Sequence, residues 1–206
     1  MPIAGTNGVF CIEGDWLNDL KRPPSVRPIL ELLTQLPPHP PYIHRVVGTR
    51  EEFDFFLGKW IQRQYAGYPI LYLGFHGCPG RIMVGDQRRS DGEVSLESLS
   101  RQLAGRCRGR VMHFGACSTL STTMEILESF LRRSGALAIS GYSTELNWVQ
   151  SAACDMLVLE GLQSCALTAR GVSKAARRIA ANSRGLGRGL RHRFIVRRQR
   201  STAASA

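Results

Sequence analysis

Short runs of apolar residues alternate along the chain with longer segments in which apolar residues recur every three or four positions. A continuous apolar run indicates a strand buried on both faces, whereas the wider spacing indicates an amphipathic helix. The apolar runs predict five strands, at residues 9–13, 42–47, 70–75, 111–116 and 136–141. A turn at residues 78–80 and a short hairpin between residues 81–84 and Val94 follow the third strand. Strands that alternate with helices in this way are typical of a parallel sheet with helices on both faces.

Helices are expected in the intervening segments because these carry apolar stripes with recognisable start and stop signals. Thr49 is expected to cap the second helix, with Glu52 three residues later completing a capping box. Pro37 and Pro38 end the first helix. The helices are predicted at about residues 26–36, 50–65, 96–107, 122–133, 147–167 and 172–181. We therefore expect one α/β domain over residues 1–183, built on a mostly parallel sheet of about five to six strands.

Length and composition agree with a single folded domain. The chain has 206 residues, of which 43% are hydrophobic, and this content indicates a protein with a full core. No apolar stretch approaches the roughly 20 residues of a membrane-spanning helix. The first residues, MPIAGTNGVF, lack the charged start and the long apolar stretch of a secretion signal. We therefore expect a cytoplasmic protein with no membrane partner.

The six cysteines show neither the paired spacing of a redox motif nor the spacing of a metal site. In a reducing cytoplasm most of them should be free thiols that pack as small apolar side chains. One or two thiols remain available for chemistry. The sequence accordingly predicts a protein that requires no metal and no organic cofactor.

The net charge of +11 is concentrated near the C-terminus. Eleven of the 27 Lys and Arg residues, and none of the 16 Asp and Glu residues, lie at or after Arg170. The preceding part of the chain is therefore electrically neutral. Residues 184–206 are rich in Arg and Gly and are expected to form a basic, flexible tail that contains at most a short strand at residues 194–196.

Three interpretations of this tail remain open. It is a solvated extension without a partner, it binds nucleic acid through phosphate contacts, or it docks on an acidic protein partner. Phe194 is its only aromatic residue, which argues against stacking on the bases of a single strand.

The third and fourth predicted strands end in the same manner. Residues 70–75 are followed by His76, and residues 111–116 are followed by Cys117. The carboxyl ends of neighbouring parallel strands share one crevice in which ligands bind, so these two side chains are expected to meet. An imidazole beside a thiol is the pair that a cysteine hydrolase uses, because the imidazole accepts the thiol proton and later protonates the leaving amine. We therefore expect His76 and Cys117 to be catalytic.

Gly77 and Cys117 are the expected donors of an oxyanion hole. The tetrahedral intermediate of acyl transfer carries a negative charge that backbone N–H groups stabilise. Gly77 follows the histidine directly, and without a Cβ it allows a substrate to come close to its N–H group. The N–H group of Cys117 is the natural second donor.

The segments around these residues resemble the paired motifs of the caspase-like cysteine peptidases. GFHG at residues 74–77 and HFGACST at residues 113–119 are similar to the histidine and cysteine motifs of the bacterial CHAT-type branch of clan CD and its uncharacterised relatives. The resemblance covers roughly residues 8–168 and includes SGYSTELNW at residues 140–148, a segment that in this superfamily helps to wall the substrate cleft. It implies a caspase-like, flavodoxin-like fold and a cysteine endopeptidase with the His76 and Cys117 roles given above. It further implies a regulated bacterial effector in stress or defence, switched on by a partner or ligand.

The sequence departs from the animal caspases in ways that bear on its substrate. Their cysteine lies in Q-A-C-[RQG]-G about 50 residues after the histidine, whereas here the motif is GACST and the spacing is shorter. Metacaspases carry an aspartate directly before the cysteine, where this chain has Ala116. No arginine pocket for an aspartate side chain can be assigned. Cleavage after Asp is therefore not implied.

Three acidic residues favour a basic substrate instead. Glu13 and Asp15 follow the first predicted strand and Glu145 follows the fifth, all near the edge that carries His76. Carboxylates at the mouth of a cleft favour a cationic side chain before the scissile bond. On this interpretation, the substrate is a protein or peptide cut after Arg or Lys. The alternative is that the three carboxylates cap helices or pair with arginines of the chain itself.

A different class of function is compatible with the same residues. A catalytically silent member of the superfamily would use the cleft to sense a ligand or to scaffold a complex, although both reactive side chains are retained here. A nucleotide-binding module is less well supported because the chain has no Gly-rich phosphate loop. His113, inside its strand, is interpreted as a core histidine, and Trp16, Trp60 and Trp148 are interpreted as packing residues.

Overall fold

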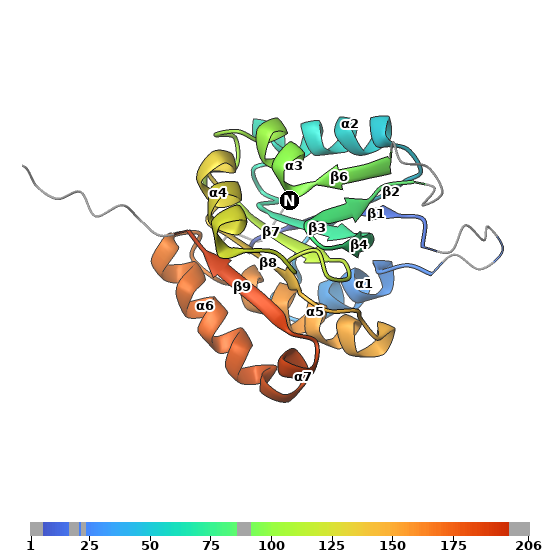
Figure 1. Cartoon of the computed structure of the whole chain (residues 1–206). Coiled ribbons are helices and arrows are strands. Elements are labelled where there is room, and N and C mark those ends of the chain that lie inside the picture. The colour runs from blue at the N-terminus through green and yellow to red at the C-terminus, as the bar shows by residue number, and fades with distance from the viewer. Residues whose placement is uncertain (1–5, 17–20, 22–23, 86–91, 198–206) are drawn as a thin grey trace, which may run out of the picture.

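Six strands form the central sheet of the computed structural model, which describes residues 6–16, 21, 24–85 and 92–197. Along the chain they are β1 (Val9–Gly14), β2 (Tyr42–Val47), β3 (Ile70–Gly74), β7 (Val111–Gly115), β8 (Ala138–Tyr142) and β9 (His192–Val196). Their order across the sheet is β2-β1-β3-β7-β8-β9, and β9 runs antiparallel to its neighbour β8. β3 and β7 therefore lie side by side at the centre of the sheet (Figure 1).

A second, smaller sheet continues from β3. It contains β4 (His76–Cys78), β5 (Arg81–Met83) and β6 (Glu93–Ser95), which pair in antiparallel fashion. The hairpin predicted after the third strand is confirmed, and β4 adds one strand to it. A single residue, Phe75, joins β3 to β4, so His76 lies at the point where the chain passes from one sheet to the other.

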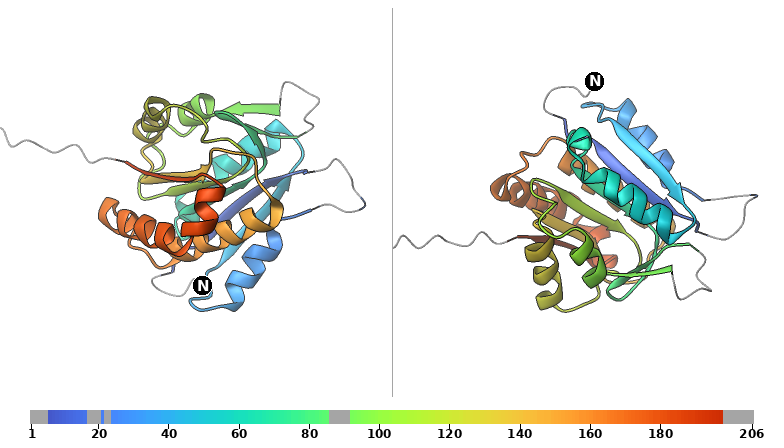
Figure 2. Two further views of the ribbon diagram at one scale, coloured as in Figure 1. Left: turned by 60° about the horizontal axis from the view of Figure 1, so that its bottom comes forward. Right: turned by 90° about the horizontal axis from the view of Figure 1, so that it is seen from above.

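Helices cover both faces of the central sheet (Figure 2). One face packs against α2 (Arg50–Trp60), α3 (Leu96–Gln102) and α4 (Met124–Ser134). The other packs against α1 (Arg27–Gln35), α5 (Trp148–Gln163) and α6 (Ala169–Asn182). The 3-10 helix η1 (Arg63–Tyr65) follows α2, and the short helix α7 (Arg184–Gly189) precedes β9. The predicted α/β fold, with a mostly parallel sheet between two layers of helices, is confirmed. Within the described part of the chain, every helix is too short or too polar to cross a membrane.

Burial on both faces explains why the central strands read as unbroken apolar runs. Successive side chains of a strand point to opposite faces of the sheet. Leu71 and Leu73 of β3 belong to the core beneath α2, α3 and α4. Ile70 and Tyr72 belong to the core beneath α1, α5 and α6. This second face carries polar side chains as well, since Tyr72 lies opposite His113 of β7.

Local signals in the sequence set the ends of α2. The Thr49 hydroxyl accepts a hydrogen bond from the Glu52 N–H at 3.2 Å, and the Glu52 carboxylate accepts one from the Thr49 N–H at 3.3 Å. The predicted capping box is therefore confirmed, and such a cap stabilises a helix by about 1 kcal/mol. The helix ends at Trp60, earlier than predicted, and the last predicted turn is the separate helix η1.

The C-terminal segment differs most from the sequence-based expectation. Residues 184–196, expected to belong to a flexible tail, form α7 and β9 instead, so the folded part extends beyond residue 183. The short predicted strand is present and longer than expected, with Ala138 opposite Val196 and Tyr142 opposite His192. The physical reason is that β8 would otherwise be an edge strand whose open N–H and C=O groups favour pairing. Residues 198–206 of the predicted tail lie outside the described residues.

A chain that ends after Arg191 should be much less stable than one that ends after Arg197. The shorter variant loses β9 and leaves one edge of β8 open, whereas the longer variant keeps the whole strand. The half-buried Phe194, Ile195 and Val196 together support a loss of at least about 3 kcal/mol in the free energy of unfolding. Urea unfolding of the two variants measures the difference. Equal unfolding midpoints would show that β9 contributes nothing to the stability of the domain.

Candidate active site

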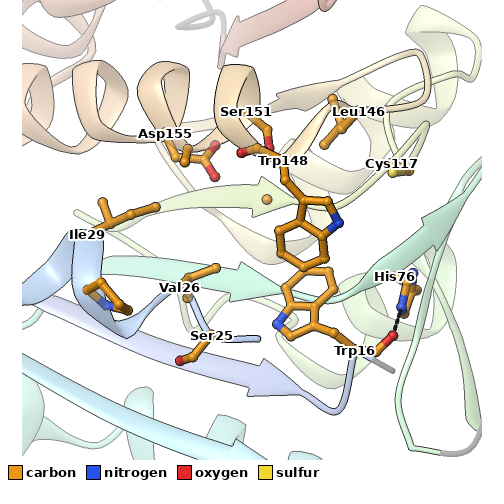
Figure 3. A pocket seen from close by; sticks show the side chains of 13 residues that line it. Trp16, Ser25, Val26, Ile29, His76, Cys117, Leu146, Trp148, Ser151 and Asp155 are labelled. Carbon is orange, nitrogen blue, oxygen red and sulfur yellow. Dashed lines mark hydrogen bonds between the residues drawn. The ribbon is translucent and has the colours of Figure 1, made fainter. Parts of the chain in front are cut away.

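The two predicted catalytic side chains lie at one edge of the central sheet. β3 and β7 pair in parallel so that Gly74 is opposite Gly115, and His76 and Cys117 each follow two residues later. Both residues line one cavity of about 360 Å³ (Figure 3). The structure thus brings them to a shared crevice, as the strand pattern predicts.

Cys117 lies in a sharp turn that is held from two sides. Ser118, directly after it, has a left-handed backbone with a φ of 52°, which turns the chain away from the strand direction. The Ser118 N–H donates to the carbonyl of Thr144, in the loop after β8, at 2.9 Å. The Thr119 carbonyl accepts from the N–H of Gly80, in the small sheet's first turn, at 3.1 Å. These contacts fix the main chain directly after the thiol.

Gly77 is required because the two strand ends touch. A Cβ at this position would lie 2.4 Å from the carbonyl oxygen of Cys117 and 2.4 Å from the hydroxyl oxygen of Thr119. One of these atoms belongs to the backbone, so a larger residue would have to displace the cysteine itself. The main chains of Gly77 and Cys117 are therefore in close contact. The predicted oxyanion donors, their two N–H groups, belong to these adjoining segments.

A backbone carbonyl orients His76. Its Nε2 atom is hydrogen-bonded to the carbonyl oxygen of Trp16 (Figure 3), and a carbonyl only accepts, so Nε2 carries the proton. In the neutral imidazole this leaves Nδ1 with the lone pair that a general base needs. The Trp16 indole packs edge-on against the imidazole, with 5.3 Å between the ring centroids. Within the described residues no hydrogen bond joins His76 to Cys117, so proton transfer between them requires a side-chain rotation or a bridging water.

Glu13 holds Trp16 in place and does not face a substrate. The residue is 1% exposed. Its carboxylate accepts from Trp16 Nε1 at 2.6 Å, the Ser25 hydroxyl at 2.7 Å, the Val26 N–H at 2.7 Å and His44 Nε2 at 2.6 Å. Burial by itself raises the pKa of Glu13, but these hydrogen bonds, led by that from His44, outweigh burial and lower the pKa below its usual value. Glu13 therefore does not lie at the mouth of the cleft as predicted, because the chain after β1 folds back over the strand end and uses the carboxylate.

The other two predicted substrate-binding carboxylates do not line the cavity either. Asp15 is half-buried after β1, and Glu145 is exposed between β8 and α5. Leu146 and Trp148, which follow Glu145, do line it and come from the segment that the resemblance assigns to the cleft wall (Figure 3). Trp148 packs edge-on against Trp16 with 4.9 Å between the ring centroids. This wall of the cavity is thus aromatic and aliphatic.

The carboxylate that does line the cavity is that of Asp155 in α5. It is buried and accepts hydrogen bonds from the Tyr72 hydroxyl at 2.7 Å and from the Tyr142 hydroxyl. His113 Nε2 is bonded to the same carboxylate at 2.7 Å, and His113 Nδ1 is bonded to the Ser140 hydroxyl at 2.8 Å. Burial, followed by the charge of Asp155, raises the pKa of both tyrosines well above the usual range, so both remain donors. His113 is therefore a satisfied core histidine, as predicted.

Glycines at the ends of β3 and β7 leave room on this face of the sheet. A Cβ on Gly115 would lie 2.5 Å from the Tyr72 ring, and a Cβ on Gly74 would lie 3.4 Å from the Trp16 indole. Because these glycines lie opposite each other in the sheet, both side-chain positions face the same layer. The Tyr72 ring, which binds Asp155, fits there because Gly115 has no side chain, whereas a Cβ on Gly74 would only touch the Trp16 indole.

Cys11, Cys107 and Cys154 differ from Cys117 because they are buried. Burial raises the pKa of Cys107 to about 12 and that of Cys154 to about 11, and it raises the pKa of Cys11 well above its usual range. Cys78 and Cys117 are both half-buried. The described residues contain no group of three or more His, Cys, Asp or Glu side chains arranged to hold a metal ion.

Sequence reasoning missed Trp16 and Asp155, although each leaves a signal. Trp16 comes three residues after Glu13, at the same sheet edge as His76, so its main chain was within reach of the site. Asp155 is one of two carboxylates in a long apolar helix, and unlike the exposed Glu160 it lies on the buried side. Burying a charged side chain costs free energy unless hydrogen bonds or a function compensate for it. A carboxylate on the buried side of a helix is therefore a candidate for a structural or functional role.

Replacing Glu13 by Gln should destabilise the protein at neutral pH and much less at acidic pH. The amide would turn N–H groups toward the donors that bind the carboxylate, at a cost of about 1–3 kcal/mol. Because the folded-state pKa of Glu13 is lowered, its stabilising contribution is complete above the unfolded-state pKa of about 4.3 and is lost as the pH falls through the folded-state value. Urea unfolding at about pH 7 and about pH 3.5 measures this change. The exposed Glu145→Gln variant is the control and should unfold like the wild type. A Glu13→Gln penalty that is equal at both pH values would contradict the assignment.

Comparison with known proteins identifies the family of the chain but not an activity. The model of a family of unknown function, DUF6642, matches residues 6–169. That range contains every residue described above as lining the cavity, and it ends before α7 and β9. No curated protein matches the chain. Since the match covers most of the sequence, the protein belongs to the family of unknown function DUF6642.

Proposed function

We propose that the protein is a cysteine endopeptidase with Cys117 as the nucleophile and His76 as the general base and acid. The observation that carries the proposal is that both residues line one cavity at the adjoining ends of β3 and β7, with His76 Nε2, and not Nδ1, bonded to the Trp16 carbonyl. A thiol in a sharp turn, an imidazole oriented by a fixed acceptor and a cavity of substrate size are parts that nucleophilic acyl transfer needs. The resemblance of residues 74–77 and 113–119 to caspase-like peptidases supports the same reaction.

The proposed reaction uses these groups in two half-reactions. His76 Nδ1 takes the Cys117 proton, and the thiolate forms a bond to the carbonyl carbon of the scissile peptide. The carbonyl oxygen becomes an oxyanion, for which the Gly77 and Cys117 N–H groups are the proposed donors. Collapse of this intermediate breaks the C–N bond, and the amine leaves with the proton from His76. Water then attacks the thioester and gives a proton to His76, after which the acid is released and the thiol takes that proton back.

The cavity is suited to a long cationic side chain. Asp155 lines it, and within the described residues its carboxylate is bonded to His113 and to two tyrosine hydroxyls but to no arginine or lysine. Trp16 and Trp148 provide aromatic surface against which an aliphatic stem and a cationic head can pack. We therefore retain a substrate with Arg or Lys before the scissile bond. The carboxylate that supports this specificity is Asp155, in place of the three acidic residues selected from the sequence.

The proposed setting rests on the family resemblance. It comprises a cytoplasmic, regulated bacterial effector in stress or defence that a partner or ligand activates. A catalytically silent protein that senses a ligand or scaffolds a complex through the same cavity is the second candidate. The lack of a hydrogen bond between His76 and Cys117 among the described contacts favours this alternative. The two candidates differ in whether the thiol reacts under the control of His76.

Cys117 should react faster with iodoacetamide than the other thiols of the folded protein. His76→Ala should slow this reaction at least about tenfold, because the base that accepts the thiol proton is lost. Mass spectrometry of peptides after brief labelling measures the rate at each cysteine. Cys78→Ser is the matched control, since Cys78 is also half-buried and lies two residues after His76, and it should leave labelling at Cys117 unchanged. Equal labelling of several cysteines, with no effect of His76→Ala, would support the silent protein.

Peptides with Arg or Lys before the scissile bond should be cut at least about tenfold faster than matched peptides with Asp. The reason is the charge of Asp155 in the cavity. Asp155→Asn should therefore reduce the preference for Arg and Lys over Asp at temperatures below its own thermal midpoint, where the variant is still folded. A fluorogenic peptide panel measures the rates, and Cys117→Ala should lower them about a thousandfold or more. Equal or reversed rates for Arg and Asp peptides would contradict this specificity while leaving the catalytic proposal intact.

A further inference from the structure

A pocket lined by arginines lies near the end of the described chain, apart from the candidate active site. It has a volume of about 320 Å³ and is formed where α6, α7 and β9 meet. Its lining residues are Ala180, Ser183, Arg184, Arg188, Arg191 and His192. It shares no residue with the cavity at His76 and Cys117, and it lies outside the residues that the family model matches.

The arginines of this pocket have no carboxylate partner among the described residues, whereas other arginines nearby are engaged. Arg178 pairs with Glu160 at 3.6 Å. Arg193 donates to main-chain carbonyls, including that of Leu120 at 2.6 Å. No Asp or Glu follows Glu160 among the 206 residues of the sequence, so the arginines of this segment have no acidic residue close to them along the chain. Like charges one helical turn apart, as at Arg184 and Arg188, repel each other. The pocket is therefore a site of concentrated positive charge.

The main chain holds these side chains at one place. Arg188 Nε donates to the carbonyl of Arg184 at 3.1 Å, which leaves both of its Nη groups for another acceptor. Arg191 has a left-handed backbone with a φ of 46° in the turn between α7 and β9. Its carbonyl accepts from the Ser143 N–H at 3.3 Å and from the Ser143 hydroxyl at 3.1 Å. The turn that carries Arg191 is thus bonded to the end of β8.

His192 adds a polar ring to the pocket wall. Its Nε2 atom is buried and has no hydrogen-bond partner among the described residues, which is unusual for a buried polar atom. The ring packs against Tyr142, with 5.5 Å between the centroids. Burial, followed by the nearby His113, lowers the pKa of His192 to about 4, so the imidazole is neutral at pH 7. The charge of the pocket therefore comes from its arginines.

We propose that this pocket binds the phosphoryl group of a small phosphorylated molecule through Arg184, Arg188 and Arg191. A guanidinium group presents donors in a planar fork that matches phosphate oxygens, and it stays charged at any physiological pH. A volume of about 320 Å³ is at the lower end of the range for small-molecule sites and accepts a phosphoryl group with little else enclosed.

A small ligand fits the pocket better than a nucleic acid strand does. Proteins that bind single strands combine an open basic groove with aromatic side chains on which bases stack. Here the arginines surround one concavity, and the lining among the described residues includes no Phe, Tyr or Trp. The proposal thus gives the basic C-terminal segment a specific role, and it stands independently of the chemistry at Cys117.

Isothermal titration calorimetry of the full chain with sodium pyrophosphate, and separately with ADP, tests the proposal in a phosphate-free buffer of low ionic strength. We expect saturable binding of one ligand per chain, weakened at least about tenfold in the Arg184→Gln/Arg188→Gln variant. Arg106→Gln/Arg108→Gln is the matched control, because it removes the same charge from exposed positions that do not line the pocket. It should bind like the wild type. Circular dichroism and the thermal midpoint without ligand show whether each variant is folded.

The outcomes separate the alternatives. Equal affinities for the two ligands, both lost in the pocket variant, assign the site to a phosphoryl group alone. Tighter binding of ADP, lost in the same variant, assigns it to a nucleotide. No saturable binding of either ligand by the wild type, or equal binding by the folded pocket variant, would overturn the proposal. Binding of a single-stranded oligonucleotide in the absence of pyrophosphate or ADP binding would also overturn it, in favour of a nucleic acid partner.

Discussion

The contact between the main chains of Gly77 and Cys117 sets the geometry on which the rest of the site depends. Each segment leaves the sheet at the end of a central strand, and the two strands are hydrogen-bonded neighbours. The segments come together because Gly77 has no side chain to keep the Cys117 carbonyl and the Thr119 hydroxyl at a distance. The small sheet is thereby anchored to the end of β7. His76 lies in β4 and Cys117 in the turn that follows β7, so the backbone of each is positioned by a paired strand of a sheet.

Two buried carboxylates support that junction. A carboxylate taken out of water is costly unless hydrogen bonds compensate it. Glu13 is compensated by donors from β2 and from the segment that returns over β1, and through them it fixes Trp16, whose carbonyl orients His76. Asp155 is compensated by side chains from β3, β7 and β8. The first carboxylate is enclosed and positions other groups, while the second also lines the cavity.

Agreement between sequence and structure is best where the signal is local. The Thr49–Glu52 capping box involves residues three positions apart, so its pattern is sufficient to locate the start of α2. The central strands are visible because burial on both faces requires unbroken apolar runs. Residues 184–193 carry no comparable signal and residues 194–196 indicate only a short strand, since glycines weaken a helix and β9 depends on its pairing with β8. That pairing joins segments far apart in the chain, which a local pattern does not record.

The positions of His76, Gly77 and Cys117 follow from the chain alone, because a residue after a buried strand must lie at the sheet edge and the strands of an α/β unit run parallel. The use of each carboxylate does not follow, because it depends on which distant donors fold onto it. Glu13 was expected at the mouth of the cleft and is enclosed by Trp16, Ser25, Val26 and His44. The Asp155 carboxylate accepts a hydrogen bond from the hydroxyl of Tyr72, which lies 83 positions away in the sequence. Hydrogen-bond partners and burial of this kind arise only when the sheet and its helices come together, so the tertiary structure assigns the polar side chains their roles.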